Sequence, residues 1–176
     1  PCGLPALPSA CRRRDAGLAL VRLLSAIDKR FPEIAGDRTV WTAGRITLEP
    51  GAPSIIPGRA EALFQFRDAD RAVLDRLHQE LHALVEAANR DGVCPMQIEV
   101  MSQSTPALMD TELQAAIEAA AEACSPGCSL RMPSGAGHDA QYLARVMPAS
   151  MLFVPSIGGI SHHWTEDTAE KDLVLG

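Results

Sequence analysis

The sequence has little of what marks a protein that binds nucleic acid or membranes. Its 176 residues carry a net charge of −6, and basic residues cluster only at 12–14. We therefore expect neither nucleic acid nor a membrane as a partner, and a small or neutral ligand is favoured. No secretory leader or long apolar run precedes the five cysteines, which indicates a reducing cytoplasm. Cys124 and Cys128 flank a turn, but no second pair at finger-like spacing follows, so idle thiols are favoured over a metal pair.

Internal repeats and low-complexity linkers are also lacking. With 47% hydrophobic residues, the chain can bury a core in one domain or in two small ones. The sequence begins with Pro1-Cys2-Gly3 rather than methionine, and residues 171–176 start a helix-like pattern that stops. We therefore expect a globular fragment whose two ends continue in a longer chain.

Periodicity in residues 1–103 predicts five elements of an α+β domain. Asp15 can cap a helix that ends at Pro32, because its apolar residues recur at spacings of three and four. Strict alternation in the second strand places Arg67 on the face opposite two phenylalanines. The predicted elements are, in order, a helix to Pro32, strands at 39–48 and 59–67, a helix at 70–91 and a strand at 97–101.

This order is that of a split βαβ, ferredoxin-like domain whose first strand is missing, and that strand would lie before residue 1. Residues 104–176 differ in composition. They predict an Ala-rich helix capped at Thr111, a Gly-rich turn at 134–137, a short helix and a buried strand at 151–154. We therefore expect the second part of the chain to be α/β.

Two Gly-rich turns of the second part, each ending in histidine, concentrate the reactive side chains. They are Pro133-Ser-Gly-Ala-Gly-His-Asp-Ala140 and Pro155-Ser-Ile-Gly-Gly-Ile-Ser-His-His-Trp-Thr-Glu166. Small residues let a ligand approach the backbone, and imidazole can bind a divalent metal or move protons. A loop histidine is nevertheless more often a hydrogen-bonded structural residue than a ligand, so the residues alone leave both interpretations open.

These segments resemble the last two motifs of the hydantoinase/carbamoylase family of metal-dependent amidohydrolases, which includes N-carbamoyl-L-amino acid hydrolases and allantoate amidohydrolases and is related to aminoacylase-type metallopeptidases. The patterns are Ser-Gly-Ala-Gly-His-Asp-Ala and Pro-Ser-x-x-Gly-Ile-Ser-His-x-x-x-Glu, and Pro-Ser-Ile-Ile-Pro-Gly at 53–58 adds a third. The resemblance runs from about Arg13 to Gly176. It implies an incomplete lid and dimerisation domain at 1–103, followed by the C-terminal portion of an α/β metallohydrolase catalytic domain at 104–176.

The resemblance implies catalytic and metal-binding roles in the second part. His162 matches the last of the metal ligands. His138 and Asp139 match a His-Asp pair, for which a catalytic role and a structural role in the loop both stay open. Glu166 is interpreted either as a residue that positions His162 or as a solvated loop acid. The two residues after His162 are candidates for the pocket wall on adjacency alone.

Substrate contacts are implied at three further positions. Arg67 matches the arginine that clamps the substrate carboxylate, and its planar guanidinium suits a bidentate contact. Gly137 matches a glycine that contacts the substrate. Ser54 stands where the family commonly has an asparagine, and a hydroxyl reaches less far than a carboxamide, so the substrate is left open. The histidine that the family usually shows before Arg13-Arg14-Asp15-Ala16 is not present here.

The implied reaction is hydrolysis of a non-peptide C–N bond, such as the carbamoyl amide of an N-carbamoyl amino acid, by water on two zinc or manganese ions. One histidine cannot hold a catalytic metal, so we expect this chain alone to bind metal weakly and to be inactive. The implied partners are a small substrate that carries a carboxylate and a second copy, which pairs through the lid.

Several alternatives stay open. The substrate is alternatively allantoate, ureidoglycolate or an aminoacylase-like amide. The chain is alternatively a non-catalytic dimerisation or small-ligand-binding module. His78 and His82 lie one helical turn apart, but a solvated helix face is favoured there over a metal site.

Overall fold

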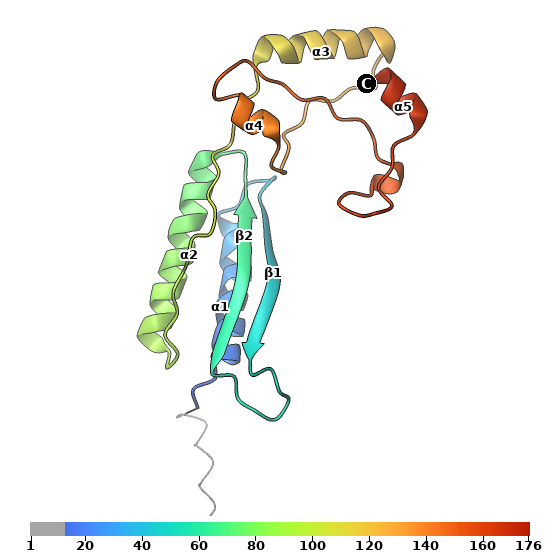
Figure 1. Cartoon of the computed structure of the whole chain (residues 1–176). Helices are drawn as coiled ribbons and strands as arrows, with labels where there is room; N and C mark the ends of the chain where they lie inside the picture. The colour runs from blue at the N-terminus through green and yellow to red at the C-terminus, as the bar shows by residue number, and fades with distance from the viewer. Residues whose placement is uncertain (1–12) are drawn as a thin grey trace, which may run out of the picture. The chain divides into compact units, whose positions relative to one another are not determined.

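The computed structural model describes residues 13–176, which form two compact units (Figure 1). Unit 1 ends at Ser104, and unit 2 runs from Thr105 to Gly176. The expectations for the first twelve residues and for a strand before them lie outside the described residues. No helix in the described part of the chain is long and apolar enough to cross a membrane.

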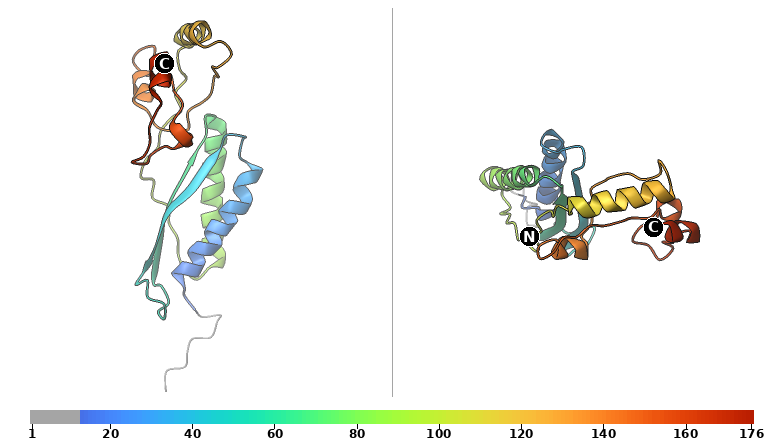
Figure 2. Two further views of the ribbon diagram at one scale, coloured as in Figure 1. Left: turned by 90° about the vertical axis from the view of Figure 1, so that its right-hand side faces the viewer. Right: turned by 90° about the horizontal axis from the view of Figure 1, so that it is seen from above.

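Unit 1 is an antiparallel β-hairpin with two helices on one of its faces (Figure 2). Both helices and both strands were predicted from periodicity, and the structure confirms them to within two residues. The elements are α1 (Ala16–Arg30), the 3-10 turn η2 (Phe31–Glu33), β1 (Val40–Glu49), β2 (Arg59–Arg67) and α2 (Arg71–Asp91).

Side-chain caps fix where the two helices begin. The carboxylate of Asp15 accepts a hydrogen bond from the backbone N–H of Leu18 at 3.0 Å, and that of Asp70 accepts one from Ala72 at 2.7 Å. Each cap satisfies an N–H group that has no partner within the helix. At the other end of α2, a Cβ on Gly92 would lie 2.5 Å from the carbonyl oxygen of Ala88, so only glycine fits there.

The hairpin register places Arg67 at one end of the strands and the β1–β2 loop at the other. Arg67 pairs with Val40, whereas Glu49 pairs with Arg59 next to the loop. The register shifts by one residue at Gly44, so Trp41 and Ala43 before this bulge lie on the same face of the hairpin as Ile46 and Leu48 after it.

An aromatic cluster fills the space between the helices and the hairpin. Phe31 is completely buried, and its ring makes edge-on contacts with Trp41, Phe64 and Phe66 at centroid distances of 5.7–5.8 Å. Because Phe66 faces this core, alternation directs the next residue, Arg67, to the opposite face. The predicted orientation of Arg67 is thus confirmed.

The prediction of a third strand at 97–101 is wrong, because this segment has no regular secondary structure and pairs with no strand among the described residues. In a split βαβ unit, a strand from elsewhere separates the two parallel strands, and no such strand is present in residues 13–104. Instead, the side-chain amide of Asn89 holds Met96, accepting from its N–H at 2.7 Å and donating to its carbonyl at 2.9 Å. The ferredoxin-like identity of unit 1 stays a prediction.

Unit 2 is helical and irregular, and it contains no β-strand between residues 105 and 176. The prediction of a buried strand at 151–154 is therefore wrong: the segment has no regular secondary structure and is partly exposed. A strand needs a neighbour to complete its hydrogen bonds, and this segment has none in unit 2. The α/β architecture expected for this part is accordingly not seen in it. The elements are α3 (Thr111–Cys124), α4 (Asp139–Leu143), the 3-10 turn η3 (Ile157–Gly159) and α5 (Glu170–Leu175).

The Ala-rich helix α3 is confirmed, but its cap lies one residue earlier than predicted. The carboxylate of Asp110, not the Thr111 hydroxyl, accepts the N–H groups of Glu112 and Leu113 at 3.0 and 2.9 Å. An aspartate and a threonine both favour this position, and the backbone conformation decides between adjacent candidates.

Candidate functional site

The first Gly-rich turn is held together by a serine that the sequence did not single out. The Ser134 hydroxyl accepts the N–H of Ala136 at 3.2 Å and lies 2.9 Å from Nε2 of His138. The His138 ring also packs on Phe153, with 5.3 Å between centroids. His138 is therefore half-buried and fixed on two sides, directly before the first residue of α4.

The two residues beside His138 face open space. Asp139 is exposed in the first turn of α4. A Cβ added to Gly137 would meet nothing within 4 Å, so local packing does not require a glycine there. The open space next to the Gly137 backbone is what a substrate contact at this residue would need.

The second Gly-rich turn is closed at its base and bends through left-handed residues. The N–H of Ile157 donates to the carbonyl of Asp167 at 2.8 Å, which joins the two ends of the loop. Gly158 and Gly159 have φ of 69° and 68°, a region open to glycine at little cost. The loop that carries His162 is thus short, closed and sharply bent.

His162 adopts a left-handed backbone conformation, with φ of 57°, and it is the one non-glycine residue with positive φ in the described part of the chain. Its N–H donates to Oε2 of Glu166 at 2.7 Å, and the Glu166 N–H donates to the carbonyl of His163 at 2.9 Å. Glu166 therefore contacts the backbone at His162, whereas the sequence had left the target of its carboxylate open. His163 lies against Trp164, which is largely exposed.

The donor set of this chain is incomplete for a metal centre. His162 is exposed, and imidazole is a good ligand for zinc and manganese, so this residue suits one position of such a site. No group of three or more His, Cys, Asp or Glu side chains gathers within residues 13–176, however. His78 and His82 are exposed on α2 with ring centroids 4.5 Å apart, and they too lack a third donor in this region.

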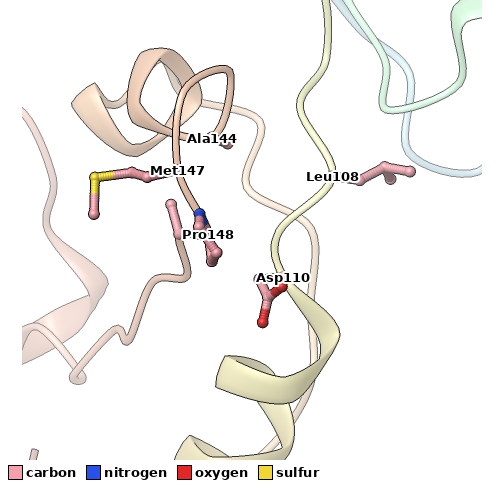
Figure 3. Close-up of a pocket in the computed structure, with 6 residues that line it drawn as sticks. Leu108, Asp110, Ala144, Met147 and Pro148 are labelled. Atoms are coloured by element: carbon pink, nitrogen blue, oxygen red, sulfur yellow. The ribbon is translucent and has the colours of Figure 1, made fainter.

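Unit 2 also contains a hollow of about 230 Å³, and no residue of the two Gly-rich turns lines it (Figure 3). It is bordered by Asp110 at the start of α3 and by Met147 and Pro148 after α4. The Asp110 carboxylate already caps α3, so it is engaged in structure rather than directed to a ligand. None of the six predicted site residues lines this hollow.

The two candidates for substrate contact in unit 1 lie far apart along the hairpin. Ser54 is exposed in the loop between the strands, whereas Arg67 is exposed at the opposite end of β2. The nine residues of β2 span about 26 Å at ~3.3 Å per residue. One small ligand therefore cannot contact Ser54 and Arg67 of the same copy.

Comparison with known proteins gives one consistent result. A model of peptidase family M20/M25/M40 matches residues 16–176. Over 93% of this chain, allantoate amidohydrolase from Bacillus subtilis is 36% identical, ureidoglycolate hydrolase from Oryza sativa subsp. japonica 33%, and N-carbamoyl-L-amino-acid amidohydrolase from Rhizobium meliloti 30%. The chain spans 39%, 34% and 39% of these relatives, respectively.

Solved structures agree with the sequence matches. An amidase of the hydantoinase/carbamoylase family from Burkholderia phymatum is 43% identical, with a TM-score of 0.86 over 97% of this chain and 41% of its own. AtUAH, whose crystal structure holds glyoxylate, is 28% identical, with a TM-score of 0.81 over 97% of this chain and 40% of its own.

Proposed function

Because this chain belongs to the peptidase family M20/M25/M40, in its hydantoinase/carbamoylase amidase subgroup, we propose that it forms part of an amidohydrolase that cleaves non-peptide C–N bonds. The proposed substrates are ureido or carbamoyl acids, the class named by the relatives. The observation that carries this proposal is the closed turn that presents an exposed His162, held by Glu166.

In this proposal the first task of the chain is to orient the substrate. Arg67 ends β2 on the face away from the aromatic core, where its guanidinium can form two parallel hydrogen bonds with a carboxylate. We propose a substrate contact for the open backbone at Gly137 as well. Holding the carboxylate fixes where the scissile amide lies, which lowers the entropic part of the barrier.

The second task is to contribute to a metal centre. Members of this family are metal-dependent, and a bound divalent ion polarises a carbonyl or lowers the pKa of a water molecule. His162 would be one ligand to zinc or manganese, and the other ligands would come from outside residues 13–176. His138, held by Ser134, and the adjacent Asp139 would face the reacting groups. This chain alone is therefore expected to bind metal weakly and to lack activity.

The separation of Ser54 and Arg67 adds a requirement for a second copy. If both residues contact one substrate, as we propose, they come from different copies, because about 26 Å of strand separates them within one copy. A homodimer that pairs through unit 1 would place the loop of one copy near the strand end of the other. The dimer would then be part of the substrate site itself.

A chimeric enzyme tests the proposal. Residues 16–176 would replace the matching segment of the Burkholderia phymatum amidase, which supplies the remaining part of the domain. We expect metal-dependent hydrolysis of allantoate, ureidoglycolate or an N-carbamoyl amino acid. The reaction is measured by the release of ammonia or by the loss of substrate. His162→Ala should abolish both tight metal binding and turnover. A folded chimera that binds metal but hydrolyses none of these substrates would contradict the proposal.

The second candidate function is a non-catalytic dimerisation or small-ligand-binding module. It is favoured by the contrast between unit 1, which has a buried aromatic core, and unit 2, which has no buried residue and no cluster of three or more potential metal ligands. Calorimetric titration of the whole chain distinguishes the two. Tight, stoichiometric binding of a small carboxylate without metal would favour the module. Weak binding of the carboxylate and of the metal would favour the proposal that the chain is part of an amidohydrolase.

A further inference from the structure

In the turn at 162–166, the backbone of His162 has an uncommon conformation and bonds to the carboxylate of Glu166, to which no catalytic role has been assigned. A non-glycine residue with positive φ is uncommon, because Cβ crowds the backbone, and such residues persist only where their surroundings hold them. His162 has φ of 57°. The contacts that hold it come from Glu166, which accepts the His162 N–H at 2.7 Å and donates its own N–H to the His163 carbonyl at 2.9 Å.

We infer that Glu166 is a positioning residue, which fixes the left-handed backbone of His162 and thereby aims its imidazole at the metal. This inference rests on the proposed function. The direction in which a side chain leaves the backbone follows from φ, so a change from left-handed to extended backbone would turn the ring away. A hydrogen bond to a carboxylate is stronger than one to a neutral acceptor, which suits a bond that must oppose backbone strain.

The route through the backbone distinguishes this role from the usual support of a metal-bound histidine. Such support is a carboxylate or carbonyl that accepts the second ring N–H and raises the basicity of the ligand. Glu166 instead bonds to the main chain, so it should act on the geometry of His162 and not on its basicity. Loss of Glu166 should weaken metal binding and lower kcat, and it should leave the KM for the substrate nearly unchanged.

The first arm of the experiment uses this chain as it stands. Amide hydrogen exchange at His162 is compared by NMR among the wild type, Glu166→Ala, Glu166→Gln and Glu170→Gln, the last being a matched loss of charge in α5. Glu166→Ala should accelerate exchange at His162 by roughly tenfold or more, as expected for a lost bond to a charged group. Glu166→Gln keeps an acceptor oxygen and should fall in between, and Glu170→Gln should leave the rate unchanged.

The second arm uses the chimera. Glu166→Ala should raise the dissociation constant for zinc by about 10- to 100-fold, the range for lost outer-shell support, and Glu166→Gln should recover part of it. If Glu166→Ala accelerates exchange but leaves zinc affinity and kcat unchanged, or leaves exchange itself unchanged, the positioning role is refuted. If instead the unsubstituted chimera binds no metal, the proposed function fails, and the exchange arm shows separately whether Glu166 holds His162.

Discussion

At the scale of single residues, Arg67 is the side chain whose role is most directly testable. In the chimera, Arg67→Ala should lower kcat/KM for a carboxylate substrate by about 10- to 100-fold, mainly through KM, because a charge-assisted bidentate contact is lost. Arg67→Lys should recover little, since an ammonium group cannot form the planar fork. Steady-state kinetics measure both variants. Arg59→Ala, on the same strand face at the other end of β2, is the matched control; Arg59 pairs with Glu49 and Glu61.

The same substitution tests whether two copies share the substrate. Chimeras carrying Arg67→Ala or Ser54→Trp would each lose activity as homodimers, and mixing them with subunit exchange would create one intact site in every heterodimer. Random pairing should thus restore about a quarter of the sites. Restored activity is the expected result. A mixture that stays as inactive as its components would place both residues on the same copy or remove Ser54 from the site.

The sequence motifs located the candidate residues, but they did not predict the hydrogen bonds of those residues. His138 and His162 could be found because each ends a Gly-rich turn. The contact of Ser134 with His138 and the bond from the His162 N–H to Glu166 depend on turn conformations that several sequences share. The positive φ of His162 is uncommon for a residue with a side chain, even though histidine adopts it more often than most, so local sequence alone could not predict it.

At the scale of elements, Asp15 makes the stability of α1 depend on pH. The hydrogen bond from the Leu18 N–H holds the pKa of Asp15 below its ordinary value of 3.8, against the opposing effect of burial and with help from Arg13. A lowered native pKa stabilises the fold above the unfolded-state pKa, and this stabilisation is lost as pH falls through the native value. The unfolding free energy of the wild type should therefore drop between pH 5 and pH 2.

Urea denaturation across this pH range measures the effect against two variants. Asp15→Asn retains a side chain that can cap but loses the charge, so its stability should depend less on pH than that of the wild type. Asp37→Asn, in an exposed loop, is the control and should follow the wild type. Equal pH profiles for the wild type and Asp15→Asn would show that the charge of Asp15 does not contribute.

Elements that depend on their own sequence were predicted, and elements that depend on a neighbour were not. The helices carry caps and periodic apolar residues, and β1 and β2 are consecutive in the chain and joined by a loop rich in proline and glycine. The residues that predict each of these elements therefore lie within or next to it. The segments at 97–101 and 151–154 have strand-like composition, but a strand also needs another strand beside it. No such neighbour exists for them in residues 13–176, and composition does not reveal this.

At the scale of the whole molecule, the two units differ in how much apolar surface they cover. The buried hydrophobic residues all belong to unit 1, where Phe31 and Leu77 are completely enclosed. Unit 2 buries no residue, although it is rich in large apolar side chains. Because the chain spans about 40% of the length of its relatives, we propose that these side chains pack against the part of the catalytic domain that those relatives also contain.

The last prediction follows from this uncovered surface: the chain should self-associate. Leu130, Val146 and Val174 are 84%, 81% and 80% exposed, and exposed apolar surface drives association of partly folded proteins at micromolar concentrations. The outer edges of β1 and β2, which pair with no strand in residues 13–176, add a second route, by strand pairing between copies. Light scattering at about 50 µM should give a mass above that of one chain.

Two sets of substitutions separate the routes. Leu130→Glu combined with Val146→Glu places charge on the apolar surface of unit 2 and should reduce the measured mass if that surface dominates, which we expect from its extent. Val40→Glu, at the start of β1, is the matched change in unit 1 and should reduce it only if strand pairing dominates. A wild-type chain that scatters as a monomer at this concentration would contradict both routes.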